Sequence, residues 1–497
     1  MSHLPQNNPD EYDEKAEATL NAVIADEGTG WSRLHHREMD TSQTGSRERQ
    51  HRVKEGKAAK IVLENLEEEG DEEEEIVQQE CRQKKKNLAQ RFLEFLFPPG
   101  SMLASAFTLG SSTLGAGILG LPSAFNMTGY ILSIMLLVIV TILTIFSLWL
   151  LARAAEVSGK RTYEDVIRTL MGRGPDWLLA FFMCGFCVGG GVGYIISIGN
   201  LLTPVFDDPS VPEFLRTKTG NRLITSMIWL VFILPLCLPK QIDSLRHTSM
   251  LGVTFIFFFV ICIVIDSCRY MNKNGFRSDL EMFGVGNGAI EGLSIIMFAC
   301  LVQINAFEVY FEMSHPSPRR MVRDSAIAMS GCGMLYILAG FFGYMRFGKT
   351  VTDSILLMYQ PRESILFAIA YVGIVFKICV AFALHQLPMR DGIYHVIGWD
   401  VYSMPWWKNA LFCTFLSFVL LVIGLFVPNI NVVFGLVGAL CGGFIGFIFP
   451  ALLVMYCGRW TFSRVGWLEY FATYFLLISG CVAVVFGTGA SIYGVIV

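Results

Sequence analysis

Ten continuous hydrophobic stretches and one interrupted stretch follow a polar N-terminal segment of about 95 residues. Each stretch approaches the ~20 apolar residues that a transmembrane helix needs. The pattern predicts an all-α polytopic membrane protein with about eleven transmembrane helices. These are expected at residues 101–125, 128–152, 176–203, 222–239, 247–268, 288–313, 323–347, 363–387, 408–427, 430–456 and 467–492.

The first stretch, from Ser101 to Phe125, is apolar at both ends but a poor helix in its middle. Glycine costs roughly 1 kcal/mol per helical position and proline more. An opened backbone inside a membrane is tolerated only where it is buried in protein or lines a cavity. The stretch therefore predicts a discontinuous helix whose free N–H groups bind a carboxylate, although the glycines could instead serve close helix packing. The binding candidates are Ser112, Thr113, Gly115, Ala116 and Gly117.

Residues 115–120 also match the pattern G-x-G-x-x-G of dinucleotide-binding proteins. That motif requires a preceding strand and an acidic residue about 20 positions later. Here both flanks are membrane-apolar, and the next acidic residue is Glu156. The sequence therefore predicts no nucleotide cofactor, and we expect no other cofactor, no metal and no nucleic-acid partner.

Composition supports a membrane protein, because 53% of the residues are hydrophobic, 16% are charged and the mean hydropathy is +0.51. Residues 1–98 hold 14 Lys and Arg against 22 Asp and Glu. Such dense charge with few aromatic residues predicts disorder. We expect residues 1–95 to form a disordered, charged cytoplasmic tail and residues 96–497 to form the transmembrane domain.

The loops between the predicted helices carry more positive charge on one side of the membrane. If the tail is cytoplasmic, the inner loops contain 14 Lys and Arg and the outer loops contain nine. This bias predicts a cytoplasmic N-terminus.

Polar side chains inside predicted helices are costly and usually functional. The sixth stretch contains Gln303, Asn305, Glu308 and Glu312, which do not share one helical face. A second interrupted helix would explain this pattern, although no glycine or proline marks the break. The first and sixth helices occupy corresponding positions in two five-helix halves, as the paired broken helices of transporters do.

The eighth stretch carries Lys377 in its middle, too deep to extend easily to the water. It is expected either to form a structural salt bridge, with Glu308 as a candidate partner, or to act as a fixed cation or proton carrier where a coupling ion would otherwise bind.

Two motifs resemble the amino acid/auxin permease family, and most of all its protozoan amino acid permeases. One comprises residues 107–109 and 115–122; the other comprises Asn305, residues 310–313 and residues 317–321. The resemblance covers residues 99–495. It implies a LeuT-like fold, with two inverted five-helix repeats and one additional helix, and an amino acid permease that works by alternating access. It also implies that the substrate carboxylate contacts residues 115–117, that its amino group contacts the first and sixth helices, and that Phe298 closes over it.

The sequence departs from the family pattern at the sites for ion coupling and substrate. Ser111 stands where sodium-coupled relatives have an asparagine, and Lys377 lies where a hydroxyl would face sodium. Together with Glu312 as a further coupling or structural charge, these residues favour proton coupling or uniport over sodium coupling. Glu308 beside the pocket favours a cationic substrate, arginine or lysine.

A neutral amino acid permease and an amino acid sensor, or transceptor, remain alternatives. No nucleophile–base arrangement points to an enzyme. We expect a multi-pass protein of the plasma membrane.

Overall fold

The computed structural model describes residues 100–207, 211–239, 243–362, 364–399, 404–427, 429–458 and 460–496. The tail expected at residues 1–95 lies outside these ranges. Every regular element within them is helical, which confirms the all-α prediction.

Ten helical spans in the described part of the chain are long and apolar enough to cross a membrane, and one bent helix pair completes eleven. The bent pair consists of α4 (Met102–Thr113) and α5 (Gly117–Thr128). The unbroken long helices are α6 (Tyr130–Ser158), α8 (Pro175–Phe206), α12 (Asp243–Asn274), α15 (Pro318–Phe347), α16 (Ile365–Ile397) and α17 (Trp406–Phe426).

The remaining spans are composite. They are α10 (Lys218–Ile228) with η2 (Trp229–Ile233) and α11 (Leu234–Cys237); α13 (Asn287–Ala299) with η3 (Gln303–Asn305) and α14 (Ala306–Glu312); α18 (Ile430–Val437) with η6 (Gly438–Ile448) and α19 (Phe449–Tyr456); and α21 (Trp467–Val482) with η7 (Ala483–Gly487) and α22 (Thr488–Ile496).

The predicted span at residues 363–387 ends too early, because α16 continues through Pro388 to Ile397. A proline removes one backbone hydrogen bond and normally ends a helix in water. Inside a bundle, neighbouring groups can satisfy the freed carbonyl, so the helix continues. The hydrophobic pattern marks the apolar part of a helix and not its full length.

Short helices lie in the connections: α7 (Tyr163–Met171), α9 (Glu213–Arg216), η4 (Gly348–Thr350), η5 (Ile355–Leu357) and α20 (Phe462–Val465). The hydrophobic pattern missed α7, because this helix is amphipathic and too short to span a membrane. Thr162 caps it by accepting a hydrogen bond from the Asp165 N–H at 3.2 Å. Tyr163 anchors it by donating to the Ile445 carbonyl at 3.0 Å.

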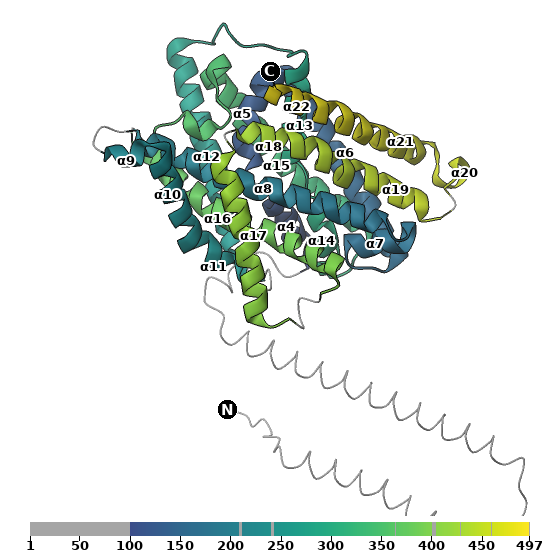
Figure 1. Cartoon of the computed structure of the whole chain (residues 1–497). Coiled ribbons are helices and arrows are strands. Elements are labelled where there is room, and N and C mark those ends of the chain that lie inside the picture. Colours follow the sequence, from purple (N-terminus) through teal and green to yellow (C-terminus); the bar gives the residue numbers. More distant parts are fainter. Residues whose placement is uncertain are drawn as a thin grey trace, which may run out of the picture. The chain divides into compact units, whose positions relative to one another are not determined.

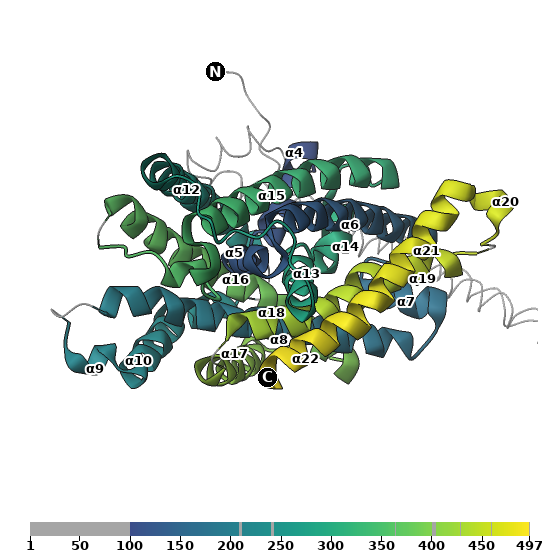
Figure 2. The same ribbon diagram turned by 90° about the horizontal axis from the view of Figure 1, so that it is seen from above.

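Helices α5 and α13, each one half of an interrupted span, occupy the middle of the bundle (Figures 1 and 2). Seen from above, α5 and α13 lie side by side, with α15 and α6 on one side and α16, α18 and α8 on the other. The span built from α21, η7 and α22 packs on η6 and α18 at the periphery. This arrangement surrounds both breaks with protein, as an opened backbone in a membrane requires.

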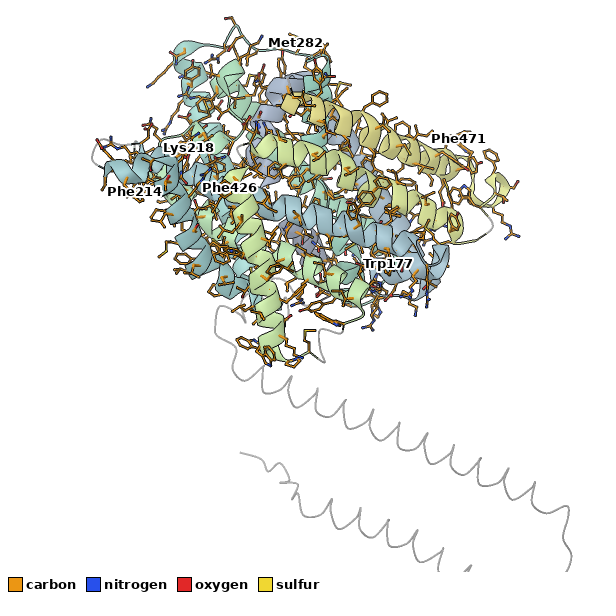
Figure 3. The ribbon with its side chains drawn as sticks, in the orientation of Figure 1. Trp177, Phe214, Lys218, Met282, Phe426 and Phe471 are labelled. Atoms are coloured by element: carbon orange, nitrogen blue, oxygen red, sulfur yellow. The ribbon has the colours of Figure 1, made fainter. Side chains whose placement is uncertain are left out.

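The outer surface of the bundle is apolar, as expected for a face in contact with lipid. Phe426 of α17 and Phe471 of α21 project outward with 67% and 61% of their surface exposed (Figure 3). Such side chains are stable at a surface that hydrocarbon covers.

Small residues permit close helix contacts inside the bundle. A Cβ atom added at Gly193 of α8 would lie 2.4 Å from Phe434 of α18, and one at Gly190 would lie 2.7 Å from His385 of α16. Gly438 fits most tightly, since its Cβ would lie 2.0 Å from the Ser294 carbonyl oxygen of α13. These three glycines therefore set the distance between the helices that they join.

We expect Gly438→Ala to destabilise the protein by about 1–3 kcal/mol, because the new methyl group meets backbone that cannot move easily. The apparent melting temperature of the purified protein measures this effect. Gly489→Ala is the matched control, because nothing lies within 4 Å of its added Cβ. Equal melting temperatures for both variants would contradict the packing described here.

Candidate functional site

The first span breaks where the sequence predicted. Its two halves, α4 and α5, meet at 64° across Leu114, Gly115 and Ala116. Hydroxyls of the last turn of α4 bond to backbone carbonyls of the preceding turn. The Ser112 hydroxyl donates to the Thr108 carbonyl at 2.9 Å, and Thr113 donates to the Leu109 carbonyl at 2.8 Å. Such hydroxyls compete with the regular helical ladder and favour a helix end.

The second break is also present, although no glycine or proline produces it. Helix α13 ends at Ala299, and a regular helix resumes only in α14. Gln303 replaces the missing backbone contacts: its Oε1 accepts from the Val302 N–H at 3.0 Å, and its Nε2 donates to the Ser147 hydroxyl at 3.3 Å. Its amide therefore stabilises the break.

A cavity of about 90 Å³ lies next to the two breaks. Side chains of α4, α8, α14 and α16 contribute most of its wall. It is lined by Phe107, Thr108, Ser111, Ser112, Leu114, Phe186, Cys187, Tyr194, Leu301, Ile304, Asn305, Glu308, Glu312, Lys377, Ala381, Leu384, His385 and Pro388. The structure thus brings together six of the predicted site residues: Ser111, Ser112, Asn305, Glu308, Glu312 and Lys377.

The cavity runs from the breaks toward one end of the bundle. The start of α4 and the end of α14 meet at that end, where the Ser314 hydroxyl donates to the Gly100 carbonyl at 2.8 Å. Glu308 and Glu312 of α14 are both solvent-exposed. Their exposure and their place on the wall mark this end as the open side of the cavity.

Three polar side chains of the second broken helix face the cavity. Asn305, Glu308 and Glu312 are spaced by three and four residues, so a helix places them along one stripe. Gln303 lies off this stripe and points into the protein. The Gln303 amide thus stabilises the break, whereas Asn305, Glu308 and Glu312 lie on the cavity wall.

The Lys377 ammonium lies at the C-terminal end of α4. It donates to the Ser111 carbonyl at 3.1 Å, and the lysine is 3% exposed. A helix C-terminus carries partial negative charge, which favours a cation there. Among the described residues, the Lys377 ammonium is therefore hydrogen-bonded to the Ser111 carbonyl and not to Glu308, its suggested partner.

Tyr194 of α8 and His385 of α16 complete the wall. Neither was a predicted site residue: Tyr194 was not singled out, and His385 was expected to be structural. The Tyr194 hydroxyl oxygen lies 3.4 Å from His385 Nδ1. The same nitrogen lies 3.1 Å from the Ala381 carbonyl oxygen. The spacing from Lys377 to His385, two helical turns, was the available signal for a shared face.

The other predicted site residues lie outside this wall. Gly115 lines an adjoining cavity of about 10 Å³ together with Tyr194 and Lys377. A Cβ atom at Gly117 would lie 2.7 Å from Ala299 Cα, so this glycine lets the two breaks touch. Thr113 and Ala116 are buried beside it. Phe298 is stacked on Phe434 with ring centroids 4.3 Å apart, one layer behind Phe186.

The opposite end of the bundle is closed by the segment between α15 and α16. Its helix η5 inserts Ile355 and Leu356, which are 1% and 0% exposed, and contacts α5 and α8. Asn431 of α18 links this segment to α5, since its amide donates to Asp353 at 3.2 Å and to Ser123 at 2.8 Å. Burial raises the pKa of the Asp353 carboxyl.

Comparisons with known proteins agree with this architecture. The sequence profile of a family described as transmembrane amino acid transporter protein matches residues 98–493. A curated relative, amino acid transporter AVT6E of Arabidopsis thaliana, is 26% identical over 410 residues, which cover 78% of this chain and 82% of the relative.

We expect Ser112→Cys to react with the membrane-impermeant methanethiosulfonate ethyltrimethylammonium when the reagent reaches the side of the membrane where α4 begins, because residue 112 lines the cavity. Labelling of right-side-out and inverted vesicles measures this difference. Thr113→Cys is the matched control, because its side chain lies off the wall, and the native chain gives the background from Cys187. Equal labelling of both variants, or labelling of Ser112→Cys only from the opposite side, would refute the assigned opening.

Proposed function

The chain belongs to the family of transmembrane amino acid transporters, and from this premise we propose that it is an amino acid permease whose substrate binds between the two broken helices. The observation that supports this proposal most strongly is the cavity lined by residues of α4 and α14. It combines opened backbone with a few polar side chains in an apolar bundle, as substrate sites of secondary transporters do.

The proposed substrate is a cationic amino acid, arginine or lysine. Glu308 and Glu312 lie on the cavity wall on consecutive turns of α14, nearer to the water than the breaks are. A substrate whose carboxylate lies at the α4–α5 break would extend its side chain toward these two acids. A guanidinium forms strong, charge-assisted hydrogen bonds with carboxylates.

The proposed mechanism is alternating access within a LeuT-like fold of two inverted five-helix repeats. Two broken helices in corresponding positions support this assignment. The cavity is open where α4 begins and is closed by η5 at the other end. With the N-terminus in the cytoplasm, as the charge of the loops favours, this arrangement is the inward-facing state of a plasma-membrane importer.

The proposed coupling does not use sodium. Lys377 places an ammonium on the carbonyl end of α4, where the unwound helices of sodium-coupled transporters coordinate their ion. A proton-coupled permease and a uniporter driven by the membrane potential both fit this arrangement. The transport assays below separate these two mechanisms.

Two other functions share the same fold. A neutral amino acid permease would use the cavity with the two glutamates in structural roles. An amino acid sensor would bind the substrate in the cavity without moving it across the membrane. Exposure of both acids to the cavity entrance favours the cationic permease.

We expect cells that express the chain to take up radiolabelled arginine, with competition by unlabelled lysine. Glu308→Gln should reduce arginine uptake by about tenfold or more, since losing a charge-assisted hydrogen bond costs about 1.5–3 kcal/mol. Glu213→Gln, an exposed acid on α9, is the matched control. If Glu308→Gln lowers the uptake of arginine and of a neutral amino acid equally, Glu308 has a structural role.

We expect arginine uptake to persist when choline replaces sodium in the medium. A protonophore that reduces uptake at a clamped membrane potential would identify proton coupling, whereas an effect only through the potential would identify uniport. A strict requirement for sodium would refute the role proposed for Lys377. No uptake of any amino acid by a correctly placed protein would favour the sensor.

A further inference from the structure

We infer that Tyr336 of α15 is a positioning residue that holds the two helix breaks together as one unit. Its hydroxyl lies 2.7 Å from the Thr113 carbonyl oxygen and 2.9 Å from the Ala299 carbonyl oxygen. Thr113 is the last residue of α4, and Ala299 is the last residue of α13. One side chain therefore contacts both half-helix ends, a contact that we name the Tyr336 bridge.

The chemistry of the two carbonyl groups explains why a hydroxyl is needed there. In a continuous helix each carbonyl would accept from the N–H four residues later, and the two breaks remove both of these bonds. Thr113 retains a contact with the Gly115 N–H at 2.9 Å. A hydroxyl carries one proton, so the two oxygens share it, and the shared proton also reduces the repulsion between two negative helix ends.

The surroundings of Tyr336 keep this hydroxyl in place. The side chain is fully buried, with 0% exposure. Two more residues on the same face of α15 contact the end of α4: the Met329 sulfur lies 3.7 Å from the Thr113 hydroxyl, and the Cys332 thiol donates to the Gly110 carbonyl at 3.6 Å. Helix α15 is unbroken from Pro318 to Phe347 and also packs on α5, α6 and α12. It therefore supplies a rigid support for both breaks.

The bridge has a consequence for transport, and this part of the inference rests on the proposed function. The Gly117 backbone contacts Ala299 directly, so the breaks already touch on one side. The Tyr336 bridge fixes them on another side. The ends of α4 and α13, beside which the proposed substrate binds, are thereby held at a constant separation while the half-helices reorient around them.

Tyr336→Phe removes the hydroxyl and keeps the ring that fills the buried site. We expect faster amide hydrogen exchange in the purified full-length protein, by about three- to tenfold, in residues 110–118 and 297–306 together, because one net hydrogen bond contributes ~1 kcal/mol. Tyr344→Phe is the matched control. Tyr344 is equally buried on α15, but its hydroxyl accepts from the Glu281 N–H, far from the breaks.

Faster exchange in only one of the two segments, in neither, or evenly along the chain would overturn the bridge. The same variant should show about fivefold lower arginine uptake per transporter at the cell surface, and the control should behave as the wild type. Uptake that stays at the wild-type level would overturn the positioning role. If the wild type itself moves no amino acid, the proposed function fails, and the exchange measurement alone decides whether the bridge exists.

Discussion

The structure depends on the requirement that every backbone amide and carbonyl inside a membrane has a hydrogen-bond partner. Unbroken helices meet this requirement without help from other segments. The two breaks do not meet it, so they lie in the middle, where other helices supply the missing partners (Figure 2). The position of the candidate site therefore follows from the energetic cost of opening a helix in an apolar medium.

Different residue types satisfy the opened backbone at each position. An ammonium from α16 reaches the Ser111 carbonyl, and a phenol from α15 reaches the carbonyls of Thr113 and Ala299. The Gln303 amide serves the second break from within the same span. Lys377 also lines the cavity, whereas Tyr336 and Gln303 hold the breaks beside it. A single substitution at these positions therefore alters packing and the shape of the site together. This coupling explains why controls matched in residue type and burial are needed.

The sequence predicts those features of this architecture that local residue preferences determine. The first break follows from serines, glycines and Pro122, whose conformational preferences act within a few residues. The second break was inferred from polar residues that share no helical face. By contrast, Tyr336 and Tyr194 are aromatic residues in apolar helices, where nothing local separates a hydrogen-bonding tyrosine from a packing one. Phe186, and not Phe298, reaches the cavity wall because helix rotation within the bundle decides which ring faces inward.

The contact between Lys377 and the Ser111 carbonyl has a consequence for the environments in which the protein can work. A dissolved ion occupies such a position in proportion to its concentration, whereas a tethered ammonium has an effective concentration that the chain itself determines. Occupancy of the α4 terminus by Lys377 is therefore independent of the salinity of the surroundings. A cell that moves between fluids of very different ionic composition would keep this part of the structure unchanged.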